Sequence, residues 1–280
     1  MKRLHRIFAN GNMALKEFLD EHCIAHEYEE SILGRTVFLL ISETDLNWSK
    51  LASHLAYNSD VFHTTELSFS RKDILQADCC TLGVISHFGY PQPEDGYQRA
   101  TYRNGSGCTS CGVGWAQEAP FRFLKKPTQK RSSALQLNWV FDEIFFPRQA
   151  RDQLNRAGFT GFRFQSPVLH KSGEPVQDWF QMQVYDVSRP VVNTATLKSE
   201  LCPDCGNTKY NHPQGEMLRL TNPFISTDLD VIKSDEWFGS GGSAYRLLFL
   251  SPRIAKFVID NKWRGVALTP CQLLDAPSTA

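Results

Sequence analysis

Three apolar segments in the first third of the chain have the length and pattern of β-strands. Residues 36–41 form a compact apolar run, residues 61–69 alternate loosely between apolar and polar side chains, and residues 82–85 form a second short run. Runs of this length are typical of buried strands, and alternation is typical of a strand with one buried face. We therefore expect a strand at each of these places.

The segments around these runs carry weaker helical patterns. Residues 1–35 are polar, with apolar side chains at helical spacing only around residues 13–19. Residues 48–55 place three apolar side chains on one face of a helix, and Asp45 or Asn47 could cap it. These patterns predict short helices between the strands.

The second half of the chain contains an internal repeat. Residues 144–150 and 248–255 each run from a short apolar stretch into the sequence Pro-Arg-x-Ala. The two prolines, Pro147 and Pro252, suit the first turn of a helix, where a backbone N–H has no partner within the helix. Each copy continues to an aromatic-x-Gly step and another apolar stretch. The repeat therefore predicts strand, helix, turn and strand in both copies.

The composition is that of an ordinary globular protein. Of the 280 residues, 41% are hydrophobic and 12% are aromatic, which argues against disorder. Lysine plus arginine equals aspartate plus glutamate at 30 each, so the net charge gives no general attraction to nucleic acid or an anionic membrane. We find no apolar run long enough to span a membrane and no signal-peptide pattern. These features predict a cytoplasmic protein with no membrane partner.

Two copies of one short cysteine motif are the strongest chemical signal in the chain. Cys108-Thr-Ser-Cys111-Gly112 and Cys202-Pro-Asp-Cys205-Gly206 each place two thiolates within reach of one ion, and 90 residues separate the copies. Two such pairs supply the four sulfurs of a closed tetrahedral zinc site. The glycine after each second cysteine suits a turn with positive φ. We expect one zinc ion bound by Cys108, Cys111, Cys202 and Cys205.

Such a zinc ion would be structural rather than catalytic. Four thiolates fill the coordination sphere and leave no position for water or substrate. Thiol redox chemistry is the alternative interpretation of a CxxC pair, but it explains one pair and not two with the same following glycine. The remaining cysteines are scattered, without the pattern of secreted disulfides, and Cys271 is expected to be a small buried side chain. The scattered cysteines are Cys23, Cys79, Cys80 and Cys271.

The cysteine motifs and the repeats occur in the same order twice. Each copy of the repeat follows one cysteine motif, and the similar segments 121–123 and 218–220 lie between them. We infer two related half-units, residues 101–195 and 196–280, each a zinc knuckle plus a strand–helix–strand element.

The patterns together predict an α/β fold of the α+β kind, with a mixed sheet and short helices. Residues 1–100 would form an N-terminal α/β region, and residues 101–280 would form the duplicated zinc-binding region. One compact domain overall is the alternative.

Three polar features could carry a function but have simpler interpretations. A basic stretch over residues 122–131 could contact nucleic acid beside a zinc ribbon, but a solvated loop is the simpler interpretation. Acidic pairs at 142–143 and 235–236 could serve acid–base catalysis, but we expect exposed residues at element ends. The glycine-rich residues 239–243 lack the rest of a phosphate-binding motif and predict a hairpin or linker. The basic residues are Arg122, Lys125, Lys126, Lys130 and Arg131.

The paired motifs give the chain a resemblance to a known family. With two CxxCG motifs about ninety residues apart, each followed by a strand and a helix, it resembles the bacterial double-CXXCG-motif proteins. The resemblance covers residues 65–275 and rests on the two motifs, the segment 138–143 and the two repeats. It implies a cytoplasmic, non-catalytic protein that binds a partner, because some members resemble immunity proteins that neutralise a toxin exchanged between neighbouring bacteria.

We therefore predict a non-catalytic, zinc-stabilised binding protein, with a toxin encoded nearby as the partner that the resemblance implies. No catalytic residues are predicted. The first alternative is a zinc-ribbon nucleic-acid-binding protein that uses residues 122–131. The second is an enzyme whose site lacks a recognisable motif, which a deep pocket of carboxylates and histidines would indicate.

Overall fold

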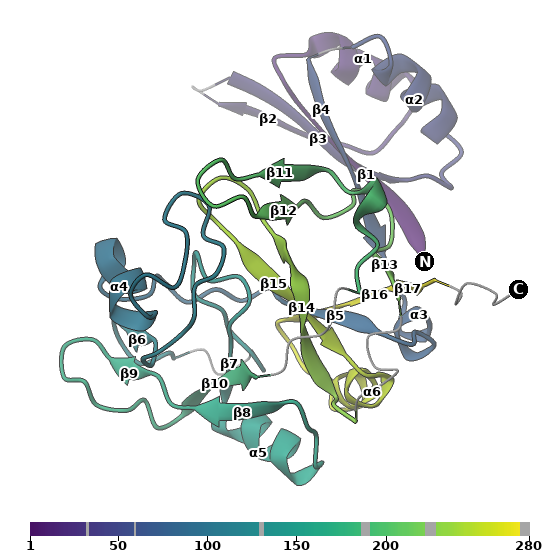
Figure 1. Cartoon of the computed structure of the whole chain (residues 1–280). Coiled ribbons are helices and arrows are strands. Elements are labelled where there is room, and N and C mark those ends of the chain that lie inside the picture. Colours follow the sequence, from purple (N-terminus) through teal and green to yellow (C-terminus); the bar gives the residue numbers. More distant parts are fainter. Residues whose placement is uncertain (32–33, 59, 129–131, 186–190, 222–227, 275–280) are drawn as a thin grey trace, which may run out of the picture. The chain divides into compact units, whose positions relative to one another are not determined.

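The computed structural model shows two compact units, each with strands and short helices (Figure 1). One unit is formed by Met1–Ser70 and Pro213–Met217, the other by Arg71–His212 and Leu218–Ala280. Short helices and a mixed sheet confirm the predicted α/β (α+β) class. The structure describes residues 1–31, 34–58, 60–128, 132–185, 191–221 and 228–274.

The first unit is a four-stranded antiparallel sheet with two helices. Its strand order is β2-β3-β1-β4, and β1 pairs with both β3 and β4. The strand predicted at 36–41 lies within β3, and the strand predicted at 61–69 forms β4, which ends one residue earlier at Ser68. The elements are β1 (Lys2–Asn10), α1 (Met13–Glu21), β2 (Glu27–Ser31), β3 (Gly34–Ser42), α2 (Trp48–Leu55) and β4 (Val61–Ser68).

Buried and exposed side chains alternate along β3, so that one face of the strand packs into the core of the first unit. Val37, Leu39 and Ile41 are buried, whereas Leu40 between them is exposed. Successive side chains of a strand point to opposite faces of the sheet, so the apolar run buries one face rather than both.

The helices of the first unit each bury apolar side chains in the same core. The Asn12 side chain caps α1 by accepting a hydrogen bond from the backbone N–H of Leu15 at 2.9 Å. Leu15 and Leu19 are fully buried. α2 matches the helix predicted over residues 48–55, and it buries Leu51.

The second unit is built on a six-stranded mixed sheet of order β11-β12-β14-β15-β5-β16. Neighbouring strands are antiparallel except for β12 and β14, which run parallel. The predicted strand at 82–85 lies largely in β5. The strands are β5 (Cys80–Val84), β11 (Ser199–Leu201), β12 (Thr208–Tyr210), β14 (Val231–Phe238), β15 (Tyr245–Leu250) and β16 (Val266–Pro270).

Smaller sheets and short helices complete the second unit. One sheet has three strands in the order β7-β10-β8, and two parallel pairs join β6 to β9 and β13 to β17. These strands are β6 (Arg122–Phe123), β7 (Ile144–Pro147), β8 (Phe162–Gln165), β9 (Val168–Leu169), β10 (Trp179–Val184), β13 (Arg219–Leu220) and β17 (Gln272–Leu273). The helices are α3 (Arg71–Leu75), η1 (Glu94–Gly96), α4 (Tyr97–Thr101), α5 (Arg148–Arg156), η2 (Thr194–Thr196) and α6 (Pro252–Asp260).

Both copies of the repeat fold as strand, helix and strand, as predicted. The first copy comprises β7, α5 and β8, and the second comprises β15, α6 and β16. Pro252 lies in the first turn of α6, after the capping residue Ser251. Pro147 instead ends β7 and caps α5, one position earlier than expected. Because proline fixes φ but lacks an N–H, either position at the start of a helix accepts it.

In each copy a third strand lies between the two strands of the repeat and is antiparallel to both. β10 separates β7 from β8, and β5 separates β15 from β16. The registers are equivalent, since Gln181 of β10 lies opposite Phe145 and Thr81 of β5 lies opposite Phe249. β5 precedes the first cysteine motif and β10 precedes the second. Each half of the second unit therefore contributes its leading strand to the sheet of the other half.

The aromatic-x-Gly steps are exchanged in the same way. Gly161 follows α5 with φ +98°, and a side chain there would collide with the backbone carbonyl of Val231. Gly265 follows α6 with φ +76°, and a side chain there would collide with Ser132. Each turn thus packs against a segment from the opposite half. Glycine is required at both places because it alone offers positive φ without a Cβ.

The boundary between the two units differs from the predicted boundary at residue 100. It falls after Ser70, because β5 is a central strand of the second unit and pairs with β15 and β16. The predicted half-units, residues 101–195 and 196–280, do not take account of this exchange of leading strands. The common origin of the two halves stays a prediction.

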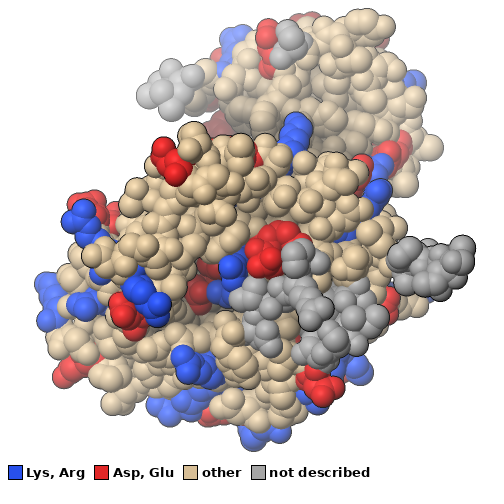
Figure 2. Space-filling model, in the orientation of Figure 1, with Lys and Arg blue, Asp and Glu red and all other residues tan. Residues whose placement is uncertain are grey.

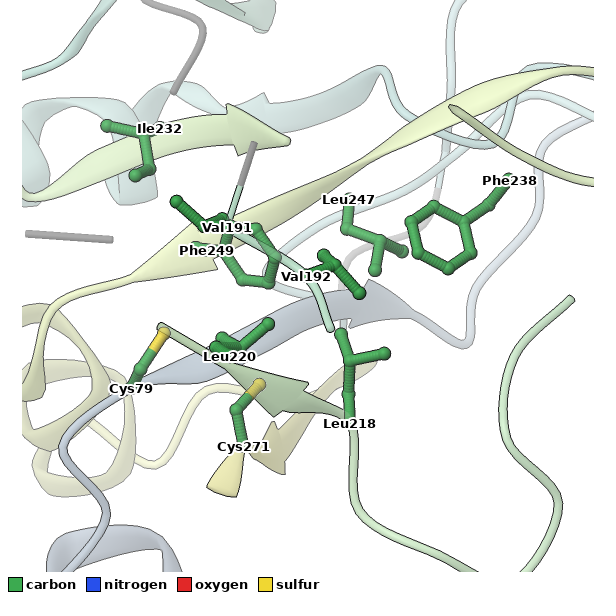
Figure 3. Packing of buried hydrophobic residues seen from close by; sticks show 10 residues of the cluster. All are labelled: Cys79, Val191, Val192, Leu218, Leu220, Ile232, Phe238, Leu247, Phe249 and Cys271. Atoms are coloured by element: carbon green, nitrogen blue, oxygen red, sulfur yellow. The ribbon is translucent and has the colours of Figure 1, made fainter. Parts of the chain in front are cut away.

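One core of the second unit brings together residues that are far apart in the sequence. Cys79, Leu220, Phe249 and Cys271 are buried in one apolar cluster (Figure 3). The backbone N–H of Cys271 donates to the carbonyl of Cys79 at 2.9 Å. A hydrogen bond between the two thiols and their burial raise the pKa of Cys79 far above its ordinary value. Cys271 is therefore the small buried side chain that the sequence predicts.

Candidate metal centre

The two cysteine motifs fold into the same tight turn, which we call the first knuckle (residues 108–112) and the second knuckle (residues 202–206). In each, the backbone N–H of the glycine donates to the carbonyl of the first cysteine, at 2.8 Å in the first knuckle and 2.9 Å in the second. The glycines have φ values of +80° and +71°. The positive φ predicted from the motif is thus present in both copies.

The four sulfurs of the knuckles lie within 4.8 Å of one another. Cys108 Sγ is 3.9 Å from Cys202 Sγ, and Cys111 Sγ is 3.6 Å from Cys205 Sγ. Four sulfurs bound about 2.3 Å from a tetrahedral zinc ion would lie about 3.8 Å apart. The spacing therefore fits a closed four-sulfur site, and these four cysteines could hold one metal ion.

The two second cysteines differ in how readily they form a thiolate. Hydrogen bonds from the backbone and side chain of Asn207 lower the pKa of Cys205 to about 6, and the Asn207 Nδ2 lies 3.3 Å from the sulfur. Burial raises the pKa of Cys111 to about 12 in the metal-free chain. Because the thiolate is the metal ligand, the second knuckle offers the ligand that is ionised first.

A buried lysine beside the centre was missed by sequence reasoning. Lys209, in β12, is 1% exposed, and its ammonium donates to the carbonyls of Cys111 at 3.2 Å, Ser243 at 3.2 Å and Gly241. Four thiolates around a divalent ion carry a net negative charge, which a nearby cation offsets. The only signal in the sequence is the position of this lysine four residues after Cys205.

The glycine-rich residues 239–243 form the turn between β14 and β15, so the predicted hairpin is confirmed. This turn packs against the first knuckle. A Cβ on Gly112 would lie 2.7 Å from the carbonyl oxygen of Gly242 and 2.9 Å from the backbone nitrogen of Ala244. A Cβ on Gly206 in the second knuckle would meet nothing within 4 Å. The hairpin therefore covers one knuckle, whereas the glycine of the other is open.

The acidic pair at 142–143 was predicted to be exposed, and this prediction is wrong. Glu143 is 8% exposed and accepts hydrogen bonds from Lys233 Nζ at 2.6 Å and Gln181 Nε2 at 2.7 Å. Asp142 Oδ2 lies 3.4 Å from the same ammonium. Burial raises the pKa of Glu143. Burial alone would lower the pKa of Lys233, but the two carboxylates outweigh it and raise that pKa. A partner 90 positions away in the sequence, Lys233, makes this burial possible.

The second acidic pair lies inside β14 rather than at its end. Asp235 is exposed, whereas Glu236 accepts backbone hydrogen bonds from Val191 at 2.7 Å and Val192 at 2.8 Å. Glu236 thus satisfies the backbone of a neighbouring segment, which is a structural role.

A cavity of about 490 Å³ opens beside the first knuckle. Gly112 of the knuckle and Gly242 of the hairpin at 239–243 line it, together with aromatic and charged side chains. The cavity gathers two carboxylates, but no histidine lines it among the described residues, so it meets only part of the criterion for an enzyme site without a motif. The aromatic and charged lining residues are Tyr97, Tyr102, Trp115, Trp139, Phe141, Tyr185, Trp237, Asp142, Glu143, Arg163, Lys233 and Arg246.

The basic stretch at 122–131 is only partly described. Lys125 and Lys126 are exposed and Arg122 is half-buried in β6, whereas Lys130 and Arg131 lie outside the described residues. Basic and acidic side chains are interspersed on the face shown in Figure 2. Nucleic-acid binding through this stretch stays a prediction.

Comparison with known proteins found no matching family model and no matching curated relative. The resemblance to the double-CXXCG-motif proteins therefore remains an expectation drawn from the motifs. Within the described parts of the chain, no helix combines the length and the apolar character needed to cross a bilayer.

Proposed function

We propose that this chain is a non-catalytic, zinc-stabilised binding protein, and that it neutralises a bacterial toxin encoded beside it. The cluster of four sulfurs is the observation that carries the proposal. Tetrahedral four-sulfur sites suit zinc. An ion enclosed by four sulfurs has no open position for a substrate, which favours a structural role over a catalytic one. The function then lies in a surface that the metal helps to shape.

Exposed aromatic side chains around the cavity support binding of a protein. Phe141 is 45% exposed, Trp139 is 46% exposed and Tyr185 is 61% exposed, and all three line the cavity. Tyr90 packs against Trp139 with ring centroids 4.3 Å apart. Large aromatic residues beside arginine are the side chains that most often dominate protein–protein interfaces. We call Trp139, Phe141 and Tyr185 the aromatic rim.

The metal centre would influence this surface indirectly, through the first knuckle. Gly112 of the first knuckle and Gly114 just after it line the cavity, so an ion that fixes the knuckle also fixes this wall. Metal removal should therefore weaken partner binding through loss of shape.

Co-expression with the toxin of a neighbouring gene tests the proposal. We expect the wild-type chain to restore growth and to co-purify with the toxin, and we expect Phe141→Ala and Tyr185→Ala to weaken both effects. Phe62→Ala is the matched control, because Phe62 is 64% exposed in the first unit. Full toxicity of every neighbouring toxin in the presence of the wild-type chain would contradict the proposal.

Elemental analysis of the purified chain tests the metal separately. We expect one zinc per chain, lost in Cys202→Ser. Two zinc ions per chain, or a different metal, would contradict the shared zinc site. A salt-dependent gel shift that Lys125→Ala and Lys126→Ala abolish would instead favour nucleic-acid binding.

A further inference from the structure

One wall of the cavity carries a guanidinium group that has no ionic partner among the described residues. Arg246 lies over the ring of Trp237, with Cζ 4.4 Å from the ring centroid. Its Nε is buried without a hydrogen-bond partner, and the carboxylates of Asp235 and Asp142 act on the guanidinium electrostatically without a side-chain hydrogen bond to it. Burial lowers the pKa of Arg246 despite the neighbouring Asp235 and Asp142. The charge is therefore desolvated and only weakly compensated.

The other charges of the cavity already have partners. Asp142 and Glu143 both contact the ammonium of Lys233, and Glu143 also accepts from Gln181. Arg163 Nε donates to the side-chain oxygen of Gln183 at 3.1 Å. A cationic ligand would have to displace Lys233 from its carboxylates, and breaking this buried ion pair is energetically unfavourable. Among the described lining residues, the buried Nε of Arg246 is the cationic donor without a hydrogen-bond partner, and it calls for an anion.

The charge balance of the cavity selects a single negative charge. Among the described lining residues, three cations, Arg163, Lys233 and Arg246, face two carboxylates, Asp142 and Glu143, while Asp235 acts on Arg246 from outside the lining, so the lining itself carries one positive charge in excess. A dianion such as a phosphate monoester would be repelled by the two carboxylates. A carboxylate matches both the left-over charge and the planar fork of an arginine side chain.

The remaining walls of the cavity suit an aromatic ring. Tyr97 packs against Trp139 with centroids 6.3 Å apart, and Tyr102 packs against Trp115 at 5.7 Å. All four line the cavity, whose volume of about 490 Å³ is that of a small-molecule site. Offset stacking on such walls favours a planar apolar group over a flexible polar one.

We infer that this cavity binds a carboxylate attached to an aromatic ring, with Arg246 contacting the carboxylate and the aromatic walls contacting the ring. The inference does not depend on the toxin proposal. The same chemistry is offered by a free aryl carboxylate and by a polypeptide that ends in phenylalanine.

Calorimetric titration of the zinc-loaded chain with 3-phenylpropanoate tests the inference, with tryptophan fluorescence as a second readout. We expect saturable binding of the carboxylate, and binding of 3-phenylpropanamide weaker by about 10-fold or more, because the amide lacks the charge. Phenyl phosphate and 3-phenylpropylamine should also bind more weakly. Equal binding of the amide, tighter binding of the amine, or no binding of 3-phenylpropanoate would overturn the inference.

Variants localise the carboxylate contact. Arg246→Gln should weaken binding of 3-phenylpropanoate by about 10-fold or more while leaving binding of the amide unchanged. Arg156→Gln is the control, since Arg156 lies on α5 outside the cavity lining. If Arg246→Gln fails to fold, Arg163→Gln is the second variant, because it replaces an exposed side chain. It should weaken binding of 3-phenylpropanoate by a smaller factor. Unchanged affinity in both arginine variants would place the carboxylate elsewhere.

Two further ligands identify the source of the carboxylate. Acetyl-glycyl-phenylalanine with a free C-terminus, compared with its C-terminal amide, represents a polypeptide end. Binding of the peptide acid but not of the amide would extend the site to a protein chain end. Binding of 3-phenylpropanoate but not of the peptide acid would restrict it to a free small molecule.

Discussion

The first and second knuckles have the same backbone turn in different surroundings. Both close with a hydrogen bond from the glycine N–H to the first cysteine, and both glycines have positive φ. The first knuckle, however, is covered by the hairpin at 239–243 and held by Lys209, whereas Gly206 and Cys205 of the second are exposed. A shared motif therefore fixes the local turn, while the surrounding packing decides how costly each change in the motif is.

The largest effects are expected from substituting a metal ligand, either the buried Cys111 of the first knuckle or the exposed Cys205 of the second. Cys111→Ser and Cys205→Ser should each abolish tight zinc binding, since a structural zinc ion contributes roughly 10 kcal/mol in small zinc peptides. Cys111→Ser should destabilise the second unit more, because it also places a hydroxyl in a buried, apolar setting. Zinc-release assays and thermal melting measure the two effects.

Cys23→Ser is the control, because Cys23 is exposed in the first unit. A larger loss of stability in Cys205→Ser than in Cys111→Ser would contradict the view that packing makes the knuckles unequal.

The glycines provide the sharpest test of the same comparison. Gly112→Ala should cost about 3 kcal/mol or more of unfolding free energy, because it adds a collision with the hairpin to the strain of positive φ. Gly206→Ala should cost about 1–2 kcal/mol, the strain alone. Urea unfolding of the zinc-loaded variants measures both values, and equal costs would show that the hairpin moves aside.

The polar neighbours of the knuckles should have smaller effects. Lys209→Met removes a donor from three carbonyls and should cost about 2 kcal/mol, whereas Asn207→Ala should cost about 1 kcal/mol at the second knuckle. Chemical unfolding compares the two. Lys209→Arg is the matched variant, because it keeps the charge in a larger side chain. An unchanged unfolding free energy in Lys209→Met would show that Lys209 does not stabilise the first knuckle.

The smallest effect concerns pH in the metal-free chain. Folding lowers the pKa of Cys205 from its ordinary value of 9.0 to about 6. This contribution to stability is fully present above pH 9 and is lost as the pH falls through 6. At pH 7 iodoacetamide should therefore alkylate Cys205 faster than Cys111, whose pKa is about 12. Mass spectrometry of partly alkylated protein gives the order, and the reverse order would contradict the assigned pKa shifts.

Local patterns predicted several elements because the needed information lies close together in the sequence. The apolar run at 36–41, the helix at 48–55 and both copies of the repeat follow from periodicity over a few residues. β1 was missed because its buried face includes His5 and Ala9, which weaken the alternating apolar signal. Its strand is formed by pairing with β3 and β4 on both sides.

The candidate metal ligands could be chosen from the sequence, but their setting could not. The spacing of the cysteines is a local property that reflects metal geometry. The burial of Glu143 depends on Lys233, and the coverage of Gly112 depends on Gly242, both far away in the chain. The cavity beside the knuckle arises from the same long-range packing, so no motif indicates it.

The exchange of leading strands has a consequence for synthesis of the chain. β5 leaves the ribosome long before the strands beside it, β15 and β16, which begin only at Tyr245 and Val266. At about 5–20 residues per second, β5 waits on the order of ten seconds or longer for a partner. During that time its edges can pair with other chains. Strands that are made late therefore complete the sheet around a strand that was made much earlier.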